Sequence, residues 1–149
     1  MIRWQRGQVM AFIAVALAIV VMPIAAYAID SETASAAAAA LEEATATAAT
    51  EASQQLDISG FRATGVLSVD AAAARGVVQA VLSAEVPTAS ITSVTVTAAE
   101  VTIATREEVP LPFDFFPERT VRLQASASAR LAGGYDRPSS RLPLPISSF

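Results

Sequence analysis

The 149-residue sequence contains no cysteine and no histidine, and all ten of its basic residues are arginines. Without cysteine the chain has no disulfide framework, and zinc or iron–sulfur sites built on cysteine or histidine are excluded. The same absences remove the Ser-His, Cys-His and Ser-Lys pairs that activate nucleophiles. No Gly-x-Ser-x-Gly or phosphate-binding glycine motif occurs. We therefore expect no enzymatic activity, no cofactor, no metal and no small-molecule substrate.

Large side chains are also scarce. Although 53% of the residues are hydrophobic, alanine supplies much of that figure, and aromatic residues make up only 6%. Outside the first 29 residues this supply supports a small sheet with one or two covering helices. The net charge is −4, and setting aside Arg3 and Arg6 leaves eight arginines against fourteen acidic residues, or −6. That balance argues against a nucleic-acid partner, which needs a clustered basic surface.

Charge is absent from residues 9–29, the longest apolar run in the chain. Twenty-one helical residues at about 1.5 Å each span about 30 Å, the hydrocarbon thickness of a bilayer. Arg3 and Arg6 precede the run and acidic residues follow it, which predicts a single-pass membrane helix with its N-terminus in the cytoplasm and its head outside. The residues that we assign to the membrane anchor are Val9, Phe12, Leu17, Val20, Ile24 and Ile29.

The same run also has the features of a cleaved signal peptide. A basic start, an apolar stretch and Ala26-Tyr27-Ala28 form a signal-peptidase pattern, and the helix-breaking Pro23 precedes the cleavage position. A chain cleaved after Ala28 would be a secreted or cell-surface binding protein with no anchor. At this point both interpretations stay open.

Beyond a basic lead at residues 1–8 and the apolar helix, we expect an alanine-rich stalk and a small α+β head. Residues 30–56 contain neither glycine nor proline, and alanine has the highest helix propensity, so this stalk should continue the membrane helix. Its small side chains fit either close packing against another helix or a free, solvated stalk. The head is assigned to residues 57–131. Two glycines at 60 and 65 indicate a turn region with a short strand. Asp70 is then expected to cap a helix at 71–85 that has one apolar face.

Alternating residues predict an antiparallel sheet of about three or four strands, covered by that helix. One strand is centred on residues 94–97 and the next on residues 101–104, with a tight turn or a bulge between them. Residues 107–117 contain three prolines and are predicted as a loop. Residues 120–131 alternate strictly and predict a long strand with one exposed face. Residues 132–149, rich in proline and serine, are expected to form a mobile tail.

Several features occur in the order found in one family. They are Gly7-Gln8, the apolar run closing on Ala28-Ile29-Asp30, the alanine-rich helix, and a late strand pair beginning at Glu100 and Thr120. Together, over roughly residues 5–131, they resemble TadE/TadG-like pilus-assembly proteins, the minor pilins or pseudopilins of tight-adherence (Flp) pili. The resemblance implies a non-enzymatic, membrane-anchored minor pilin or assembly scaffold. Its helix and head would contact other pilus or envelope proteins.

One difference from that family concerns processing. Its cleaved members carry a glycine at the cleavage site and a glutamate at the fifth position after it. Here Gly7 is the corresponding glycine, but Phe12 occupies the fifth position. The resemblance therefore implies an uncleaved, TadG-like anchor.

Phe113, Phe115 and Phe116 lie in a segment bracketed by prolines and are the strongest candidates for a partner contact. Exposed together, they would anchor a protein partner or a membrane. Alternatively, they would fold back over Val77 and Val81 of the helix at 71–85, and the scarcity of other large residues favours this second arrangement.

The acidic residues give no sign of a catalytic pair. Neighbours in sequence point apart on a helix or strand, so Glu42-Glu43 and Glu107-Glu108 are expected to be solvated. Asp30 and Glu32 follow the apolar run, where a cation at the membrane surface is one interpretation and plain solvation is the favoured one.

Overall fold

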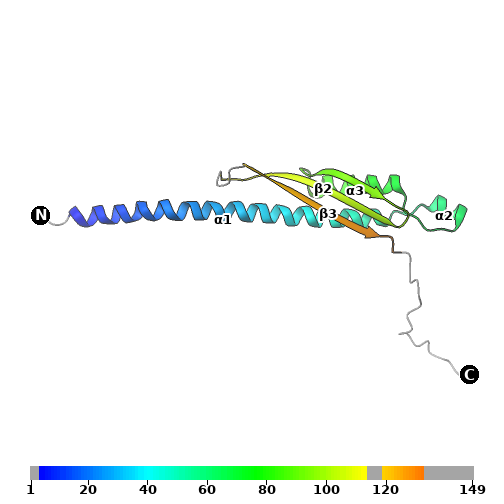
Figure 1. Cartoon of the computed structure of the whole chain (residues 1–149), viewed down its shortest axis with the longest axis horizontal. Helices are drawn as coiled ribbons and strands as arrows, with labels where there is room; N and C mark the ends of the chain where they lie inside the picture. The colour runs from blue at the N-terminus through cyan, green and yellow to red at the C-terminus, as the bar shows by residue number, and fades with distance from the viewer. Residues whose placement is uncertain (1–3, 114–118, 133–149) are drawn as a thin grey trace, which may run out of the picture.

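The predicted α+β class is confirmed by a computed structural model, which describes residues 4–113 and 119–132. Within these residues three helices precede a three-stranded antiparallel sheet of order β1-β2-β3. The first helix projects far beyond the head, which gathers around its C-terminal half (Figure 1). The elements are α1 (Trp4–Ser53), α2 (Ile58–Thr64), α3 (Ala71–Glu85), β1 (Ser90–Val96), β2 (Glu100–Pro110) and β3 (Thr120–Arg130).

Helix α1 contains both the apolar run and the alanine-rich run in 50 continuous residues. At about 1.5 Å per residue it is about 75 Å long. Pro23 lies inside it without ending it. The prediction of a single rod is confirmed, and its physical basis is the alanine-rich composition together with the absence of glycine between residues 8 and 59.

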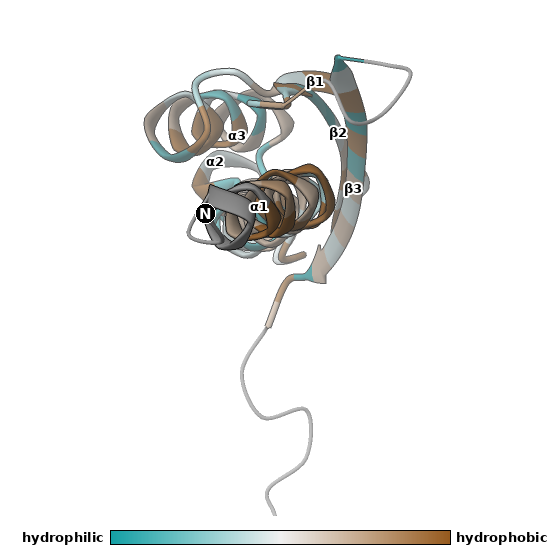
Figure 2. Ribbon diagram, turned by 90° about the vertical axis from the view of Figure 1, so that its left-hand side faces the viewer, coloured by the Kyte–Doolittle hydropathy of each residue, from teal (hydrophilic) through white to brown (hydrophobic). Residues whose placement is uncertain are grey.

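The head is built on one face of α1. Buried residues recur along this helix at helical spacing from Leu41 to Ser53, and most of them are small. Asp30 is buried separately, nearer the apolar run. Figure 2 shows the sheet curving around α1, with α3 lying beside the same helix. The largest apolar side chains that are almost fully buried are Leu41, Val78, Val101 and Ile103, contributed by α1, α3 and β2.

The central strand β2 sets the register of the sheet. Ile103 stands opposite Val94 of β1 and opposite Ala127 of β3, and all three lie on the face that packs towards α1. The alternation predicted for residues 120–131 is confirmed, because the polar side of β3 is exposed. The tight turn before β2 is also confirmed by a 2.8 Å hydrogen bond from the Thr97 N–H to the Glu100 carbonyl. The bulge lies elsewhere, at Thr92 in β1.

The prediction of a turn and short strand for residues 56–69 was wrong in its main element, because this segment contains α2. The carboxylate of Asp57 accepts the Gly60 N–H at 2.8 Å and caps the helix, and Gly65 ends it with a φ of 72°. A Cβ on Gly60 would collide with the Asp57 carboxylate. The glycines therefore belong to a short helix and its caps, and only one isolated bridge, Leu56 to Val69, is extended.

The loop prediction for residues 107–117 was wrong for residues 107–110, which continue β2. Pro110 pairs with Thr120 although it lacks an N–H. The next residue, Leu111, donates its N–H to the Arg119 carbonyl at 2.9 Å, so the nitrogen of Pro110 faces the opposite side. Strand β1 pairs with β2 no further than Arg106, and the missing donor therefore breaks no ladder bond.

We predict that the small-residue face of α1 tolerates no enlargement. Ala48 is fully buried, whereas Ala46, two residues away, is exposed. Ala48→Leu should lower the free energy of unfolding by about 1–3 kcal/mol, because the sheet cannot move away without losing its other contacts. Ala46→Leu makes the same chemical change and should stay within about 0.5 kcal/mol. Urea unfolding of the detergent-solubilised chain, followed by circular dichroism, checks this, and equal effects of the two substitutions would contradict the packing described.

Candidate functional site

The apolar run at residues 9–29 is the most exposed part of α1. Of its residues only Pro23 and Ala26 are half-buried, and Phe12 is 74% exposed. α1 is long and apolar enough to cross a membrane, and it is the one such helix among the described residues. The six residues assigned to the anchor are all exposed: Val9, Phe12, Leu17, Val20, Ile24 and Ile29.

The residues proposed for topology and processing fall on or near the same helix. Ala26 and Ala28 lie inside α1, without a break in the helix at the signal-peptidase pattern. Arg6 and Gly7 also lie within α1. Arg3 lies outside the described residues.

Burial by the head begins at Asp30, the first charged residue after the apolar run. Its side chain is fully buried, and its Oδ1 accepts the backbone N–H of Phe113 at 2.9 Å. Oδ2 is buried as well, and within residues 4–113 and 119–132 it has no hydrogen-bond partner. The expectation of a solvated Asp30 was wrong, because the β2–β3 hairpin runs along α1 as far as this residue. We call this contact between Asp30 and Phe113 the junction.

Glu107 is a second acid whose predicted solvation was wrong. It lies on the inner face of β2 and is only 8% exposed. Its Oε1 accepts a hydrogen bond from the hydroxyl of Thr88 at 2.5 Å. Its Oε2 is buried, with no hydrogen-bond partner in the part of the chain that the structure describes. The alternation of β2 explains this position, because Val109 on the same face is also buried.

The other acids behave as expected. Glu32, Glu42 and Glu43 are exposed. Among the described residues, no three acidic side chains gather to hold a metal ion.

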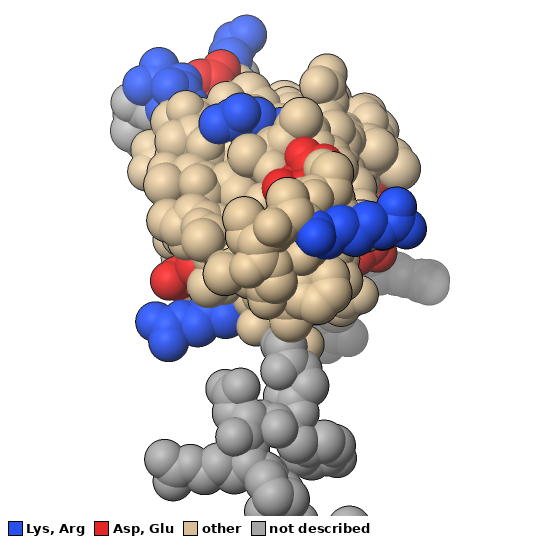
Figure 3. Space-filling view, turned by 90° about the vertical axis from the view of Figure 1, so that its right-hand side faces the viewer, with Lys and Arg blue, Asp and Glu red and all other residues tan. Residues whose placement is uncertain are grey.

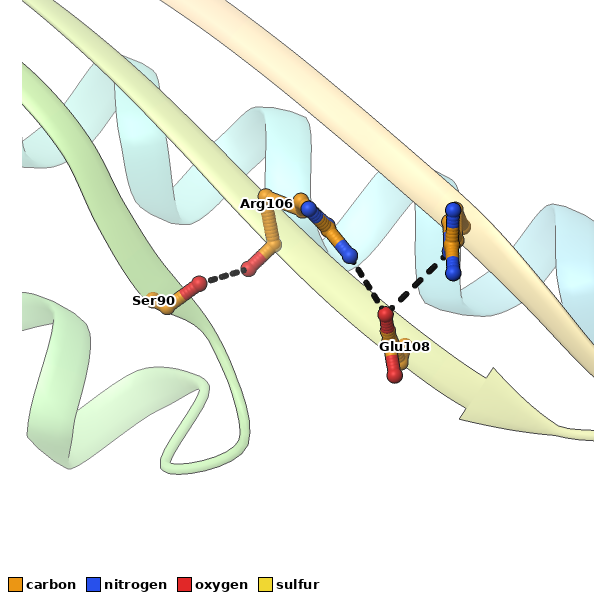
Figure 4. A network of polar contacts seen from close by, with 4 residues as sticks. Ser90, Arg106 and Glu108 are labelled. Atoms are coloured by element: carbon orange, nitrogen blue, oxygen red, sulfur yellow. Dashed lines mark hydrogen bonds and ion pairs between the residues drawn. The ribbon is translucent and has the colours of Figure 1, made fainter.

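Glu108 lies on the outer face of the sheet in a small charged network (Figure 4). Arg106 donates to its carboxylate at 2.5 Å, and Arg122 of β3 lies 3.3 Å from it. The hydrogen bond from Arg106 is the main cause that lowers the pKa of Glu108 below its ordinary value, and the charges of both arginines add to it. Ser90 donates to the Arg106 carbonyl at 3.1 Å.

Next to this network is an open hollow of about 490 Å³ on the outer face of the sheet. Hydroxyl groups of Ser90, Thr92 and Ser126 line it, with the amide of Gln124. The charged group in the lining, Arg106, is already paired with Glu108. The lining of the hollow therefore has no general base that could activate one of its hydroxyl groups as a nucleophile.

The phenylalanine segment is only partly described. Phe113 is 44% exposed and lies where the β2–β3 hairpin reaches α1, far along the long axis of the molecule from α3 (Figure 1). Phe113 therefore does not fold back over the Val77 and Val81 face of α3. Phe115 and Phe116 lie outside the described residues.

An exposed apolar cluster at the opposite end of the head was missed by the sequence reasoning. We call it the distal patch, and its members are between 44% and 62% exposed. The glycines of this segment predict a turn. The sequence signal for an apolar surface is the presence of five large apolar residues within twelve positions, in a head that has few of them. The distal patch consists of Leu56, Ile58, Phe61, Val66 and Leu67.

Charged side chains surround this end of the molecule and leave uncharged surface between them (Figure 3). The nearest acid in sequence is Asp57, whose pKa is lowered chiefly by the hydrogen bond from the Gly60 N–H and also by the Ser59 hydroxyl. Asp57 is therefore used in capping α2. The described part of the chain thus has two exposed apolar surfaces, the helix at residues 9–29 and the distal patch.

Compared with models of known protein families, with curated proteins and with solved structures, the chain matches none of them.

We predict that the junction depends on a carboxylate or amide oxygen at residue 30. Asp30→Ala leaves the partly buried Phe113 N–H without an acceptor, at a cost of about 1–3 kcal/mol, so this amide should exchange with deuterium roughly 5- to 150-fold faster. Asp30→Asn keeps an acceptor oxygen and should stay close to the wild type. Glu32→Ala, on the exposed side, is the matched control. Unchanged exchange at Phe113 in Asp30→Ala would show that the hydrogen bond does not hold the hairpin.

Proposed function

We propose that this chain is a non-enzymatic, single-pass component of the bacterial cytoplasmic membrane that holds a small α+β head outside the cytoplasm. The observation that carries the proposal is the continuity of α1. Its exposed apolar run passes without a break into the helix around which the head is packed.

Physical chemistry supports a bilayer as the environment of residues 9–29. A helix satisfies its own backbone hydrogen bonds, which makes it one of the few structures that hydrocarbon accepts. An exposed apolar run of this length is unfavourable in water, because removing apolar surface from water stabilises a protein by about 25 cal/mol for each Å². Arg3 and Arg6 on one side, and acidic residues from Asp30 onwards on the other, support the inward N-terminus.

The role that we propose is structural: a minor pilin or assembly scaffold of the TadE/TadG type. The anchor and the head share one helix, so the head cannot swivel on a flexible linker. The 24 residues from Asp30 to Ser53 extend about 36 Å. The distal patch lies at the end of the head remote from the apolar run (Figure 1), and in this proposal that end faces away from the membrane. We assign this patch to contact with another protein of the envelope assembly, because a cluster of large apolar side chains on a small head is typical of protein interfaces.

One observation favours the alternative, a secreted protein cleaved after Ala28. The fully buried positions of α1 begin at Asp30, so such a cleavage would leave the core of the head intact. The two proposals differ in the first residue of the mature chain and in the attachment of the head.

The absence of cysteine gives a direct test of the anchor. Single cysteines at Gln5 and Ser128 place one thiol on each side of the proposed span, and Ser128 lies on the exposed face of β3. A membrane-impermeant maleimide added to spheroplasts should label Ser128→Cys, whereas Gln5→Cys should react only after lysis. Intact mass should give a chain that begins at Met1 and stays with the membrane in high salt. A chain that begins at Ile29 would overturn the anchor, and one that begins at Gln8 would indicate prepilin-type processing.

The same membrane preparation tests the assembly role. On a native gel the wild-type chain should migrate in a complex larger than itself, and Ile58→Ser combined with Phe61→Ser should release it without changing its mass or its membrane attachment. Ser126→Ala, on the outer face of the sheet, is the control and should leave the complex intact. A wild-type chain that migrates alone would contradict the assembly role while leaving the anchor in place.

A further inference from the structure

The segment that follows β2, residues 111–113, reaches the level where the apolar run of α1 ends. Phe113 follows β2 by three residues, and its N–H is 2.9 Å from Oδ1 of Asp30. Asp30 directly follows Ile29, the last residue of the run. The hydrogen bond therefore fixes the height of Phe113 along α1.

Three further observations describe the surface at this height. Phe113 is 44% exposed and Tyr27, one turn before Asp30, is 50% exposed, so two aromatic side chains face outward near the boundary. The carboxylate of Asp30 is covered completely. Pro23 and Ala26 lie on the same face of α1 as Asp30 and are the half-buried residues of an otherwise exposed run.

We propose that the segment after β2, residues 111–113, makes a second membrane contact, at which Phe113 enters the interfacial layer of the same bilayer that holds α1. The proposal rests on the membrane anchoring of α1 and adds to it a contact made by the head. The occupant is the phospholipid interface, and the residues that meet it are Phe113 and Tyr27.

Geometry selects the bilayer over a protein partner at this position. A membrane that covers residues 9–29 must have its boundary near Asp30, because the first charge after the run lies there. Phe113 is hydrogen-bonded to that residue and cannot stand away from the boundary. Aromatic side chains are favoured in this layer, where an apolar ring lies near polar headgroups.

The burial of Asp30 fits this arrangement. A carboxylate facing lipid at the edge of the hydrocarbon is costly, and such groups usually turn towards protein. Here the hairpin covers Asp30 and presents Phe113 instead. The head would therefore rest on the membrane at two points, the helix and the hairpin, which restricts its tilt.

Tryptophan fluorescence in vesicles tests the contact. In the full chain, the substitution Trp4→Phe removes the one native tryptophan. The substitution Phe113→Trp then introduces a fluorescent probe at the junction. The vesicles contain phosphatidylethanolamine and phosphatidylglycerol, with a fraction of the lipid brominated either close to the headgroup or near the chain end. Phe113→Trp should lose emission to the shallow quencher, lose less to the deep quencher, and emit further to the blue than a water-exposed tryptophan.

Two matched variants separate this proposal from the anchor itself. Phe61→Trp places the probe in the distal patch at the same 44% exposure as Phe113 and should be quenched by neither lipid. Phe12→Trp lies in the apolar run and should be quenched by the bilayer wherever the head lies. Quenching of Phe12→Trp without quenching of Phe113→Trp overturns the hairpin contact and leaves the anchor. Absence of quenching in both overturns the anchor as well.

A protein partner at the junction would give a distinct result, namely blue-shifted emission from Phe113→Trp that neither brominated lipid quenches, and this result also overturns the proposal.

Should the tryptophan disturb folding, judged by near-ultraviolet circular dichroism, a nitroxide on Phe113→Cys replaces it, with Phe61→Cys as control. Greater accessibility of the Phe113→Cys label to oxygen than to a water-soluble nickel complex supports the contact. The reverse order, shared with the Phe61→Cys label, overturns it.

Discussion

The sheet and helix α3 pack against small side chains along the second half of α1, and the rest of the structure depends on that contact. Ala44, Ala48 and Ala52 are almost completely buried there, and each contributes little apolar area. Their size instead lets the helix and the sheet approach closely. The approach is close enough for Thr45 of α1 and Thr105 of β2 to share a 2.7 Å hydrogen bond, which satisfies two buried hydroxyl groups at the interface. A chain poor in large residues thus forms its core through the close approach of helix and sheet, and not through large side chains.

This packing makes α1 the common element of two environments. From residue 9 to residue 29 the helix exposes apolar side chains, and from Asp30 it is the central helix of the head. Any tilt of the apolar half is therefore transmitted to the head. The junction at Asp30 and the distal patch lie at opposite ends of the head, one towards the apolar run and one away from it (Figure 1). Such a plan suits a component that presents one surface at a fixed height and orientation.

The local elements of this fold were predictable from the sequence, and the contacts between distant segments were not. Helix α3 has the predicted bounds because Asp70 accepts the N–H groups of Ala72 and Ala73 and caps it. Strand β3 follows an alternation that one face of a sheet imposes. Asp30, in contrast, contacts Phe113, which lies 83 residues later in the chain. No local sequence pattern predicts that contact.

Proline and glycine caused two further errors, because each was interpreted without its surroundings. Pro110 indicated a loop, yet it lies in β2 where no neighbouring strand needs its N–H. Gly60 and Gly65 indicated a turn, yet they support α2 and thereby the distal patch. Of the candidate sites, the long apolar helix followed from composition and length alone. The distal patch and the junction required the fold.

The central claim is that α1 continues as one helix from the apolar run into the head when the chain is in a membrane. Nitroxide labels on Val20→Cys and Ala46→Cys, both at exposed positions on either side of Pro23 and Asp30, measure this by pulsed electron resonance in lipid nanodiscs. Twenty-six helical residues at about 1.5 Å each separate the two backbone positions by about 39 Å. We expect one narrow distribution near that distance. A broad distribution, or one centred many ångströms shorter, would show that the helix bends or breaks between the apolar run and the head and would contradict the account.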